Sequence, residues 1–280
     1  MVGLKTGGYG VHLYKDQFSE THDFPRQEGP DKTLVIASTP RCGSHMLGHT
    51  LHQTGCFGFP LEYANPANLQ EWKRRIDTES TERVIRELTQ RRTSPNGVFG
   101  IKLHYTHISV LGGFDGVQAL FPEAYYVLLS REGVLKQAVS LAIARQTGVW
   151  IAGQEPKNSN PPEYRFAQIE KCLREVILDN ASWRYTLAAN GCNYIEMDFD
   201  SVRMNLGASV HAIAEFMDVQ LEENLAQEEH VTARQGSSLN DEWVAQFVRD
   251  FENSNNELVS PDPGLKQRLL TKFRTMLSVG

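Results

Sequence analysis

Three cationic side chains, Arg41, Lys102 and Arg131, could together form a binding site for an anion. Each stands near the end of, or just beyond, a short apolar run of the kind that forms a buried strand. If these strands are parallel, their carboxyl ends meet at one edge of the sheet, where ligands of such folds bind. Arginine and lysine pair well with phosphate groups. The spacing therefore predicts a local cationic site for a phosphate ester.

The segment around Arg41 predicts the arrangement that such a site needs. Residues 34–37 form an apolar strand, residues 38–43 a tight turn, and a helical pattern begins at Ser44. The first N–H groups of a helix lack internal partners, and the helix dipole favours negative charge there. Gly43 allows the backbone to approach a ligand closely. An ordinary strand-to-helix turn of an α/β protein would have the same elements, so the turn alone leaves both interpretations open.

The sequence does not indicate metal-dependent nucleotide chemistry. The turn lacks the Gly-Lys-Ser/Thr ending of a nucleotide-triphosphate loop, and it contains no lysine. This argues against an Mg-nucleotide triphosphatase. His104 and His107 form a His-x-x-His pair, but no third ligand is evident, so we predict polar positions there and no metal site.

Glu62 lies in a segment, 55–66, whose two glycines and two prolines predict a long, well-defined loop. Its neighbours Leu61 and Tyr63 are apolar. A carboxylate buried among apolar side chains tends to have a raised pKa. The alternative is a loop glutamate that faces solvent and has no special role.

The remaining patterns predict an α/β fold with a mostly parallel sheet and helices on both faces. Further strands are expected at 98–103, 124–130 and 192–197. Helices are expected at about 66–77, 80–92, 134–143, 163–190, 200–217, from 240 onwards, and 263–277. With 280 residues the chain can form one large domain or two small ones, and we expect an extension over 1–30 and one domain over 31–280.

Composition narrows the class of protein. The net charge is 28 − 34 = −6, which is unfavourable for a general nucleic-acid binder. The four cysteines show no zinc spacing, and free thiols in a reducing compartment account for them. No stretch approaches 18 apolar residues and the first 30 residues lack an apolar signal core, so we expect a cytoplasmic protein without a transmembrane anchor.

Four segments resemble sulfotransferases that use 3′-phosphoadenosine 5′-phosphosulfate (PAPS), in particular the bacterial Stf0 family of trehalose, lipopolysaccharide and Nod-factor type. Residues 37–45 are similar to its 5′-phosphosulfate loop, and 55–63 to its Gly…Gly-x-Pro-x-Glu loop. Residues 130–150 are similar to its 3′-phosphate strand and helix, and 234–243 to its C-terminal motif. The order and spacing of the four segments agree with the family, which implies a P-loop-like three-layer fold.

The resemblance implies a role for each matching residue. The 5′-phosphosulfate would be held by Arg41, Cys42, Gly43, Ser44, His45 and Met46. The 3′-phosphate would be held by Arg131 and Ser140, with Arg234, Gln235 and Gly236 closing over the nucleotide. Glu62 would be the general base, with Arg41 and Lys102 as the other catalytic residues. The acceptor would contact Phe59, Leu61, Glu62, Tyr63 and Trp150.

The implied reaction transfers a sulfuryl group to a hydroxyl of a carbohydrate, a glycolipid or another small amphipathic alcohol. A sulfuryl group carries less charge than a phosphoryl group, so fixed protein donors can replace Mg²⁺, and we expect metal-independent in-line transfer. Cys42 stands where the family has Ser, and His45 where Thr is common. Phe59 and Leu61 favour a small molecule with apolar character, such as a glycolipid or another amphipathic alcohol, over trehalose itself. The family also suggests a homodimer.

Two other interpretations stay open at this point. A kinase-like phosphotransferase would share the broad fold, although the missing lysine argues against it. A nucleotide-binding regulatory module would bind the donor without transferring its sulfuryl group, and the substitutions at Cys42 and His45 keep this possibility open.

Overall fold

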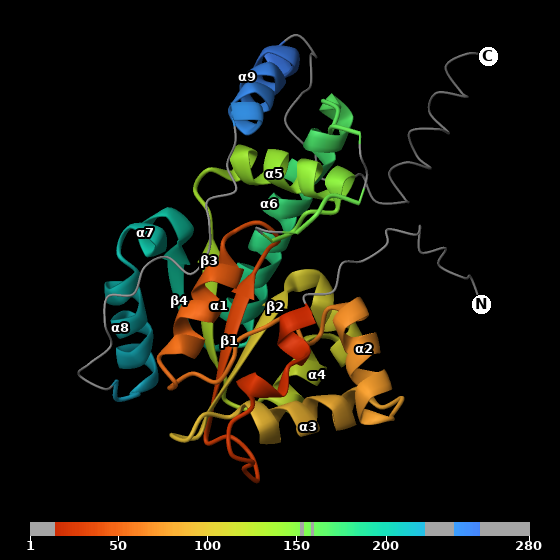
Figure 1. Ribbon diagram of the computed structural model, residues 1–280. Helices are drawn as coiled ribbons and strands as arrows, with labels where there is room; N and C mark the ends of the chain where they lie inside the picture. The colour runs from red at the N-terminus through yellow and green to blue at the C-terminus, as the bar shows by residue number, and fades with distance from the viewer. Residues whose placement is uncertain (1–14, 152–153, 158–159, 222–237, 253–280) are drawn as a thin grey trace, which may run out of the picture.

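A parallel four-stranded sheet forms the centre of the computed structural model, which describes residues 15–151, 154–157, 160–221 and 238–252 (Figure 1). The strand order is β2-β1-β3-β4, and all three pairings are parallel. The strands are β1 (Lys32–Ser38), β2 (Val98–His104), β3 (Tyr125–Ser130) and β4 (Asn193–Asp198). The α/β class predicted from the sequence is confirmed.

Helices cover both faces of the sheet, as Figure 1 shows. The helices of the described residues are α1 (Ser44–Gln53), α2 (Pro66–Ile76), α3 (Thr81–Arg92), α4 (Gly113–Leu120), α5 (Val134–Thr147), α6 (Phe166–Ala189), α7 (Phe199–Met204), α8 (Leu206–Met217) and α9 (Ser238–Glu252). No helix within these residues is both long and apolar enough to cross a membrane.

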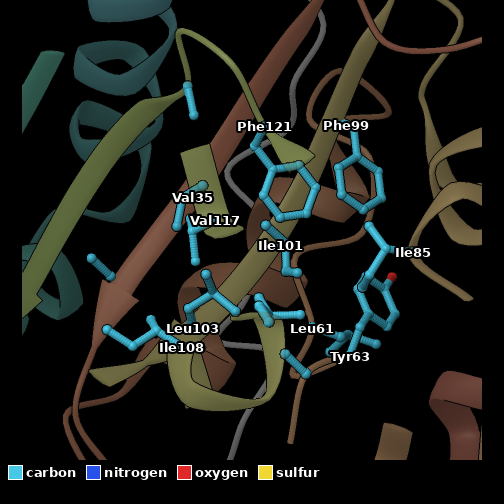
Figure 2. Close-up of a cluster of buried hydrophobic side chains, with 14 of the residues drawn as sticks. Val35, Leu61, Tyr63, Ile85, Phe99, Ile101, Leu103, Ile108, Val117 and Phe121 are labelled. Atoms are coloured by element: carbon cyan, nitrogen blue, oxygen red, sulfur yellow. The ribbon is translucent and has the colours of Figure 1, made fainter. Parts of the chain in front are cut away.

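The core follows from the alternation of side chains along β1. Val35 and Ala37 face a cluster that also includes side chains of α2, α3, α4 and the end of α6, and Figure 2 shows its centre. Leu34 and Ile36 face the opposite way, into a cluster with α1, α7 and α8. Successive strand residues point to opposite faces, so an apolar run such as β1 buries both of its sides.

A third apolar cluster lies between α5, α6 and α9. Helix α6 has 24 residues and joins two clusters, because Ile169 and Val176 belong to the third cluster while Trp183 and Leu187 pack on the sheet. The two ends of α6 therefore have different partners, and its middle passes the end of the sheet.

Several predicted boundaries differ from the structure. The helix predicted over 200–217 is divided into α7 and α8, because Asn205 interrupts it and its side chain caps α8 at the N–H of Ala208. A 3-10 helix, Tyr105–Leu111, and α4 were not predicted, since both are short, Gly112 separates them, and α4 itself begins with a glycine. The predicted helix over 263–277 lies outside the described residues.

The N-terminal segment packs on the domain from residue 15 onward. Arg92, whose side chain is fully buried at the end of α3, pairs through Nε with Asp23 Oδ1 at 2.7 Å. Its Nη2 donates to the carbonyl oxygens of Gln17 and Ser19 at 3.0 and 2.9 Å. Phe18 lies against the ring of Trp72, with centroids 4.9 Å apart. Residues 15–23 thus contribute to the core and are held by the buried guanidinium of Arg92 together with Arg91, whose Nε donates to Asp23 Oδ2 at 2.8 Å.

We predict that Arg92→Ala destabilises the protein far more than Arg26→Ala does. Removing Arg92 leaves two carbonyl groups without their partner and Asp23 with Arg91 alone, and breaking a buried pair costs about 3–5 kcal/mol. Arg26 also pairs with a carboxylate, Glu87, at 2.6 Å, but its side chain is 56% exposed. Such a surface pair contributes about 0–1 kcal/mol. Urea unfolding of both variants measures the difference, and equal losses would contradict the role given to Arg92.

Candidate active site

The connection from β1 to α1 has a left-handed backbone at two positions. Arg41 has a φ of 67° and Gly43, the residue before the first turn of α1, a φ of 85°. A Cβ atom on Gly43 would lie 2.0 Å from Cδ2 of Phe199, at the start of α7. Glycine is therefore required here both by the backbone and by the packing. The tight turn predicted over 38–43 brings the N–H groups of the first turn of α1 to the carboxyl edge of the sheet.

Side chains from α5 and α6 hold this turn in place. Gln137 is fully buried and its Nε2 donates to Thr39 Oγ1 at 2.8 Å and to the carbonyl oxygen of Pro40 at 2.7 Å. Trp183 Nε1 donates to the carbonyl oxygen of Ser38 at 3.1 Å. Three consecutive turn residues thus have partners outside the turn, which fixes the direction in which Arg41 leaves the backbone.

Two arginines lie close together beside this turn. Arg41 Nε donates to Ser140 Oγ at 3.0 Å, and its Nη1 also contacts the carbonyl oxygen of Trp150. Arg131 lies over the ring of Phe199, 5.3 Å from its centroid, and its buried Nε has no hydrogen-bond partner among the described residues. Burial, and then the charge of Arg131, lower the pKa of Arg41 to about 10. Two half-buried cations repel each other, and an anion bound between them would remove this repulsion.

The first turn of α1 contributes backbone more than side chains. Cys42 is fully buried, and Cys42 and Met46 both belong to the cluster between the sheet and α8. Their side chains therefore face the core, so a contact from either residue to an anion would have to come from its N–H group. Ser44 is also buried, and His45 is partly exposed.

Glu62 is placed beside β2 by a short backbone pairing. Leu61 forms a parallel bridge with Ile101, and the N–H of Lys102 donates to the carbonyl oxygen of Leu61 at 2.9 Å. As a result, Lys102 Nζ lies 2.9 Å from Glu62 Oε1. The structure brings together two residues that are 40 positions apart in the sequence and that we had expected to share one site.

His104 completes this group and was missed as a site residue. Its Nε2 lies 3.2 Å from Glu62 Oε1, and its Nδ1 lies 3.1 Å from Ser38 Oγ on the neighbouring strand. Lys102 and His104 are two positions apart on β2, so they point to the same face. This spacing was the available signal, but the His-x-x-His pattern drew attention to metal ligands instead. Among the described residues, no three His, Cys, Asp or Glu side chains form a group that could hold a metal ion.

The pKa expected for Glu62 was wrong in direction. Burial alone would raise the pKa of Glu62, but the charges of Lys102 and His104 hold it well below its ordinary value. The expectation considered only the apolar neighbours in the sequence, whereas Lys102 and His104 from β2 face the carboxylate. Asn65 Nδ2 donates to the other oxygen, Oε2, at 3.2 Å, and the side chain stays 24% exposed. Glu62 is therefore an ionised carboxylate that solvent can reach.

Two further histidines around Glu62 are neutral. Burial lowers the pKa of His45 to about 2, and the charge of Lys102 adds to this effect. Burial and the nearby His104 lower the pKa of His107 to about 3. The charges of both Lys102 and Glu62 influence the pKa of His45, so the start of α1 and the Glu62–Lys102 pair lie in one region.

Three predicted acceptor contacts are core residues. Phe59, Leu61 and Tyr63 are at most 2% exposed, and Figure 2 shows Leu61 and Tyr63 among side chains of β2 and its neighbours. These three side chains have the ordinary role of core packing, so they do not support an apolar acceptor. Trp150 differs, because it is 37% exposed. Arg234, Gln235 and Gly236 lie outside the described residues.

Fold and site together define an α/β protein with a cationic strand–turn–helix site and an ionised carboxylate at the same edge of the sheet. Comparison with known proteins identifies the family. The profile of the Stf0 sulphotransferases matches residues 33–250, and the chain belongs to this family. It is thus a sulfotransferase, as the resemblance of the four segments implied.

Two curated relatives share about a quarter of their residues with this chain. The trehalose 2-sulfotransferase of Mycobacterium tuberculosis is 26% identical over 255 residues, which cover 77% of this chain and 94% of that protein. The trehalose 2-sulfotransferase of Mycolicibacterium smegmatis is 24% identical, with 80% and 96% covered. Among solved structures, a sulfotransferase from Alicyclobacillus acidocaldarius aligns with a TM-score of 0.48 and 14% identity, over 78% of this chain and 92% of that one.

We predict that Gln137→Leu weakens binding of adenosine 3′,5′-bisphosphate, the nucleotide product that the resemblance implies, by about 10-fold or more. The substitution removes both hydrogen bonds that the Gln137 amide donates to the turn, each of which contributes about 1 kcal/mol. The turn then no longer fixes the direction of Arg41. Calorimetric titration measures the affinity. Gln168→Leu makes the same change on α6, where the glutamine bonds to Gln146 and not to the turn, and it should leave the affinity unchanged. Equal affinities in both variants would contradict a positioning role for Gln137.

Proposed function

We propose that this protein transfers the sulfuryl group of PAPS to a hydroxyl of a carbohydrate or another small hydroxylated molecule, with Glu62 as general base. One observation carries the proposal. The close pair Arg41 and Arg131 and the ionised Glu62 flank the same turn, at the carboxyl edge of a parallel sheet. This arrangement suits a donor with two anionic ends and an acceptor that loses a proton.

The donor would bind along the turn and the start of α5. Its 5′-phosphosulfate would accept hydrogen bonds from the N–H groups at the start of α1 and from Arg41. Its 3′-phosphate would bind Arg131 and Ser140, which lies on α5. The contact between Arg41 Nε and Ser140 Oγ supports a short path between the two anionic ends. The buried Nε of Arg131 has no partner among the described residues, which supports Arg131 as a donor to an anionic ligand.

In the reaction, the acceptor oxygen attacks sulfur as the bond from sulfur to the bridging oxygen breaks. The acceptor proton moves to Glu62, and negative charge develops on the 5′-phosphate. Arg41 and the start of α1 would stabilise this charge, and one such preorganised donor changes rates by about 10²–10³-fold. General-base catalysis by a side chain contributes about 10²–10⁴-fold. The products are a sulfate ester and adenosine 3′,5′-bisphosphate.

The lowered pKa of Glu62 affects its strength as a general base. A carboxylate of low pKa is a weak base, but it remains ionised at every pH at which the protein operates. Lys102 and His104 both contact Oε1, whereas Oε2 accepts one hydrogen bond, from Asn65. We infer that Oε2 faces the acceptor. His104 already uses both ring nitrogens, so it cannot accept the acceptor proton directly and acts as a positioning residue.

Further properties are proposed on the same basis. The names of the two curated relatives favour a carbohydrate acceptor, and the burial of Phe59 and Leu61 removes the reason for preferring an amphipathic one. We also propose a homodimer, a cytoplasmic location, metal-independent transfer, and a single transferase domain over 31–280.

We predict that Glu62→Gln retains nucleotide affinity and loses at least about 10²-fold in turnover, because the amide cannot accept the proton. Turnover with labelled PAPS and calorimetry with adenosine 3′,5′-bisphosphate measure the two properties. In the wild type, activity should fall only as the pH drops through the lowered pKa of Glu62, below pH 4.5. Glu71→Gln, at a partly exposed carboxylate on α2 that is ion-paired with Arg74, is the matched control. Near-normal turnover of Glu62→Gln would exclude Glu62 as the base.

We predict that Arg131→Ala weakens adenosine 3′,5′-bisphosphate much more than adenosine 5′-phosphate. A charged hydrogen bond to the 3′-phosphate contributes about 1.5–3 kcal/mol, or roughly 10- to 100-fold in affinity. Titration of both nucleotides into the wild type and the variant gives the ratio. Arg165→Ala, at an exposed arginine paired with Glu163, should change neither affinity. An equal loss for the two nucleotides would refute a 3′-phosphate role for Arg131.

A further inference from the structure

Asp179, in the middle of α6, has a half-buried carboxylate with no hydrogen bond or ion pair from the described residues. Its neighbours on the helix are engaged. Asn180 Oδ1 accepts from Thr39 Oγ1 at 3.4 Å, and Glu175 Oε2 lies 2.6 Å from Arg145 Nη1. A half-buried carboxylate loses hydration, and this loss is normally offset by a partner. Asp179 lacks such a partner within the described part of the chain.

The position of Asp179 along α6 places it above the sheet edge. Trp183, four residues later, donates to the carbonyl oxygen of Ser38 and so marks the level at which β1 ends. Val176, three residues earlier, already belongs to the cluster with α5 and α9. Residues four apart lie on the same helix face, about 6 Å apart along the axis. Asp179 therefore lies one turn beyond the carboxyl ends of the strands, on the face that Trp183 presents to the sheet.

Ser38 connects His104 to the face of α6 that carries Asp179, because His104 Nδ1 lies 3.1 Å from Ser38 Oγ and Trp183 Nε1 donates to the carbonyl oxygen of Ser38. Glu62 contacts the Nε2 of this imidazole at 3.2 Å. Burial, and then the charge of Glu175, raise the pKa of Asp179, whereas the charge of His104 lowers it. Glu62, from the loop after α1, and Asp179, from α6, therefore both lie in the region of His104. The nearby turn residue Thr39 connects α6 to the donor side of the same site.

We propose that Asp179 is a specificity-determining residue that accepts a hydrogen bond from a second hydroxyl of the acceptor, which makes this enzyme selective for polyhydroxylated acceptors. The inference rests on the proposed function, in which Glu62 takes the attacking hydroxyl. A sugar presents a second hydroxyl one or two carbons away, and this hydroxyl would compensate the lost hydration of Asp179. An alcohol with one hydroxyl would leave the Asp179 carboxylate unpaired, and a site built around a hydrogen bond rejects such analogues strongly.

The test compares acceptors with one and with many hydroxyls. Trehalose and glucose serve as polyhydroxylated probes and cyclohexanol as the monohydroxylated probe, each with labelled PAPS. Asp179→Ala should lower kcat/KM for the sugars by about 10- to 100-fold, mostly through KM, and leave kcat/KM for cyclohexanol unchanged. Asp179→Asn should lie between Asp179→Ala and the wild type, because its amide oxygen still accepts. Glu170→Ala, on the same helix and ion-paired with Arg174, should behave as the wild type.

The outcomes separate the inference from the function on which it rests. Unchanged kcat/KM for the sugars in Asp179→Ala would overturn the inference, as would an equal loss for sugars and cyclohexanol. A wild type that prefers cyclohexanol would also overturn it. Adenosine 3′,5′-bisphosphate titration checks that each variant folds and binds the nucleotide. If the wild type binds this nucleotide but sulfates neither these probes nor any component of a metabolite extract, the proposed function itself is contradicted.

Discussion

The contact between Gly43 and Phe199 is the constraint on which the site depends. It allows the chain to reverse within a few residues of β1, so that α1 begins at the edge of the sheet with its N–H groups directed outward. Phe199 also lies under the guanidinium of Arg131, which means that one ring shapes the turn and supports the second cation. The hydrogen bonds of Gln137 and Trp183 hold a conformation that this close packing has already selected.

The site has two halves with opposite electrostatic character. Beside the turn after β1, which is the proposed donor side, cations lie close together and their mutual repulsion favours an anionic ligand. On the proposed acceptor side, Lys102 and His104 contact Glu62 and stabilise its negative charge. The neutral histidines His45 and His107 add polar groups to the region without adding charge. The half with Arg41 and Arg131 is therefore suited to bind an anion, and the half with Glu62 keeps its carboxylate ionised.

The sequence was sufficient for the strands and most of the helices, and insufficient for the contacts between them. The apolar runs that form β1, β2 and β3 bury both faces, so their composition identifies them, and the turn after β1 follows from its glycine and its position. The contact of Glu62 with Lys102 depends on the bridge from Leu61 to Ile101, a long-range pairing that no local pattern encodes. The burial of Phe59 and Tyr63 and the position of Asp179 also depend on packing between distant segments, because the residue types alone fit several environments.

The bridge at Leu61 has a consequence for the solubility of the protein. Strand β2 lies at the edge of the sheet, and an uncovered edge strand offers its free N–H and C=O groups to other chains. Leu61 pairs with Ile101 on this outer side, and Thr93 pairs with Phe99 further along the same edge. The segment that carries Glu62 thus also shields β2 from intermolecular strand pairing. Changes in this loop that alter acceptor choice would therefore be limited by aggregation as well as by catalysis.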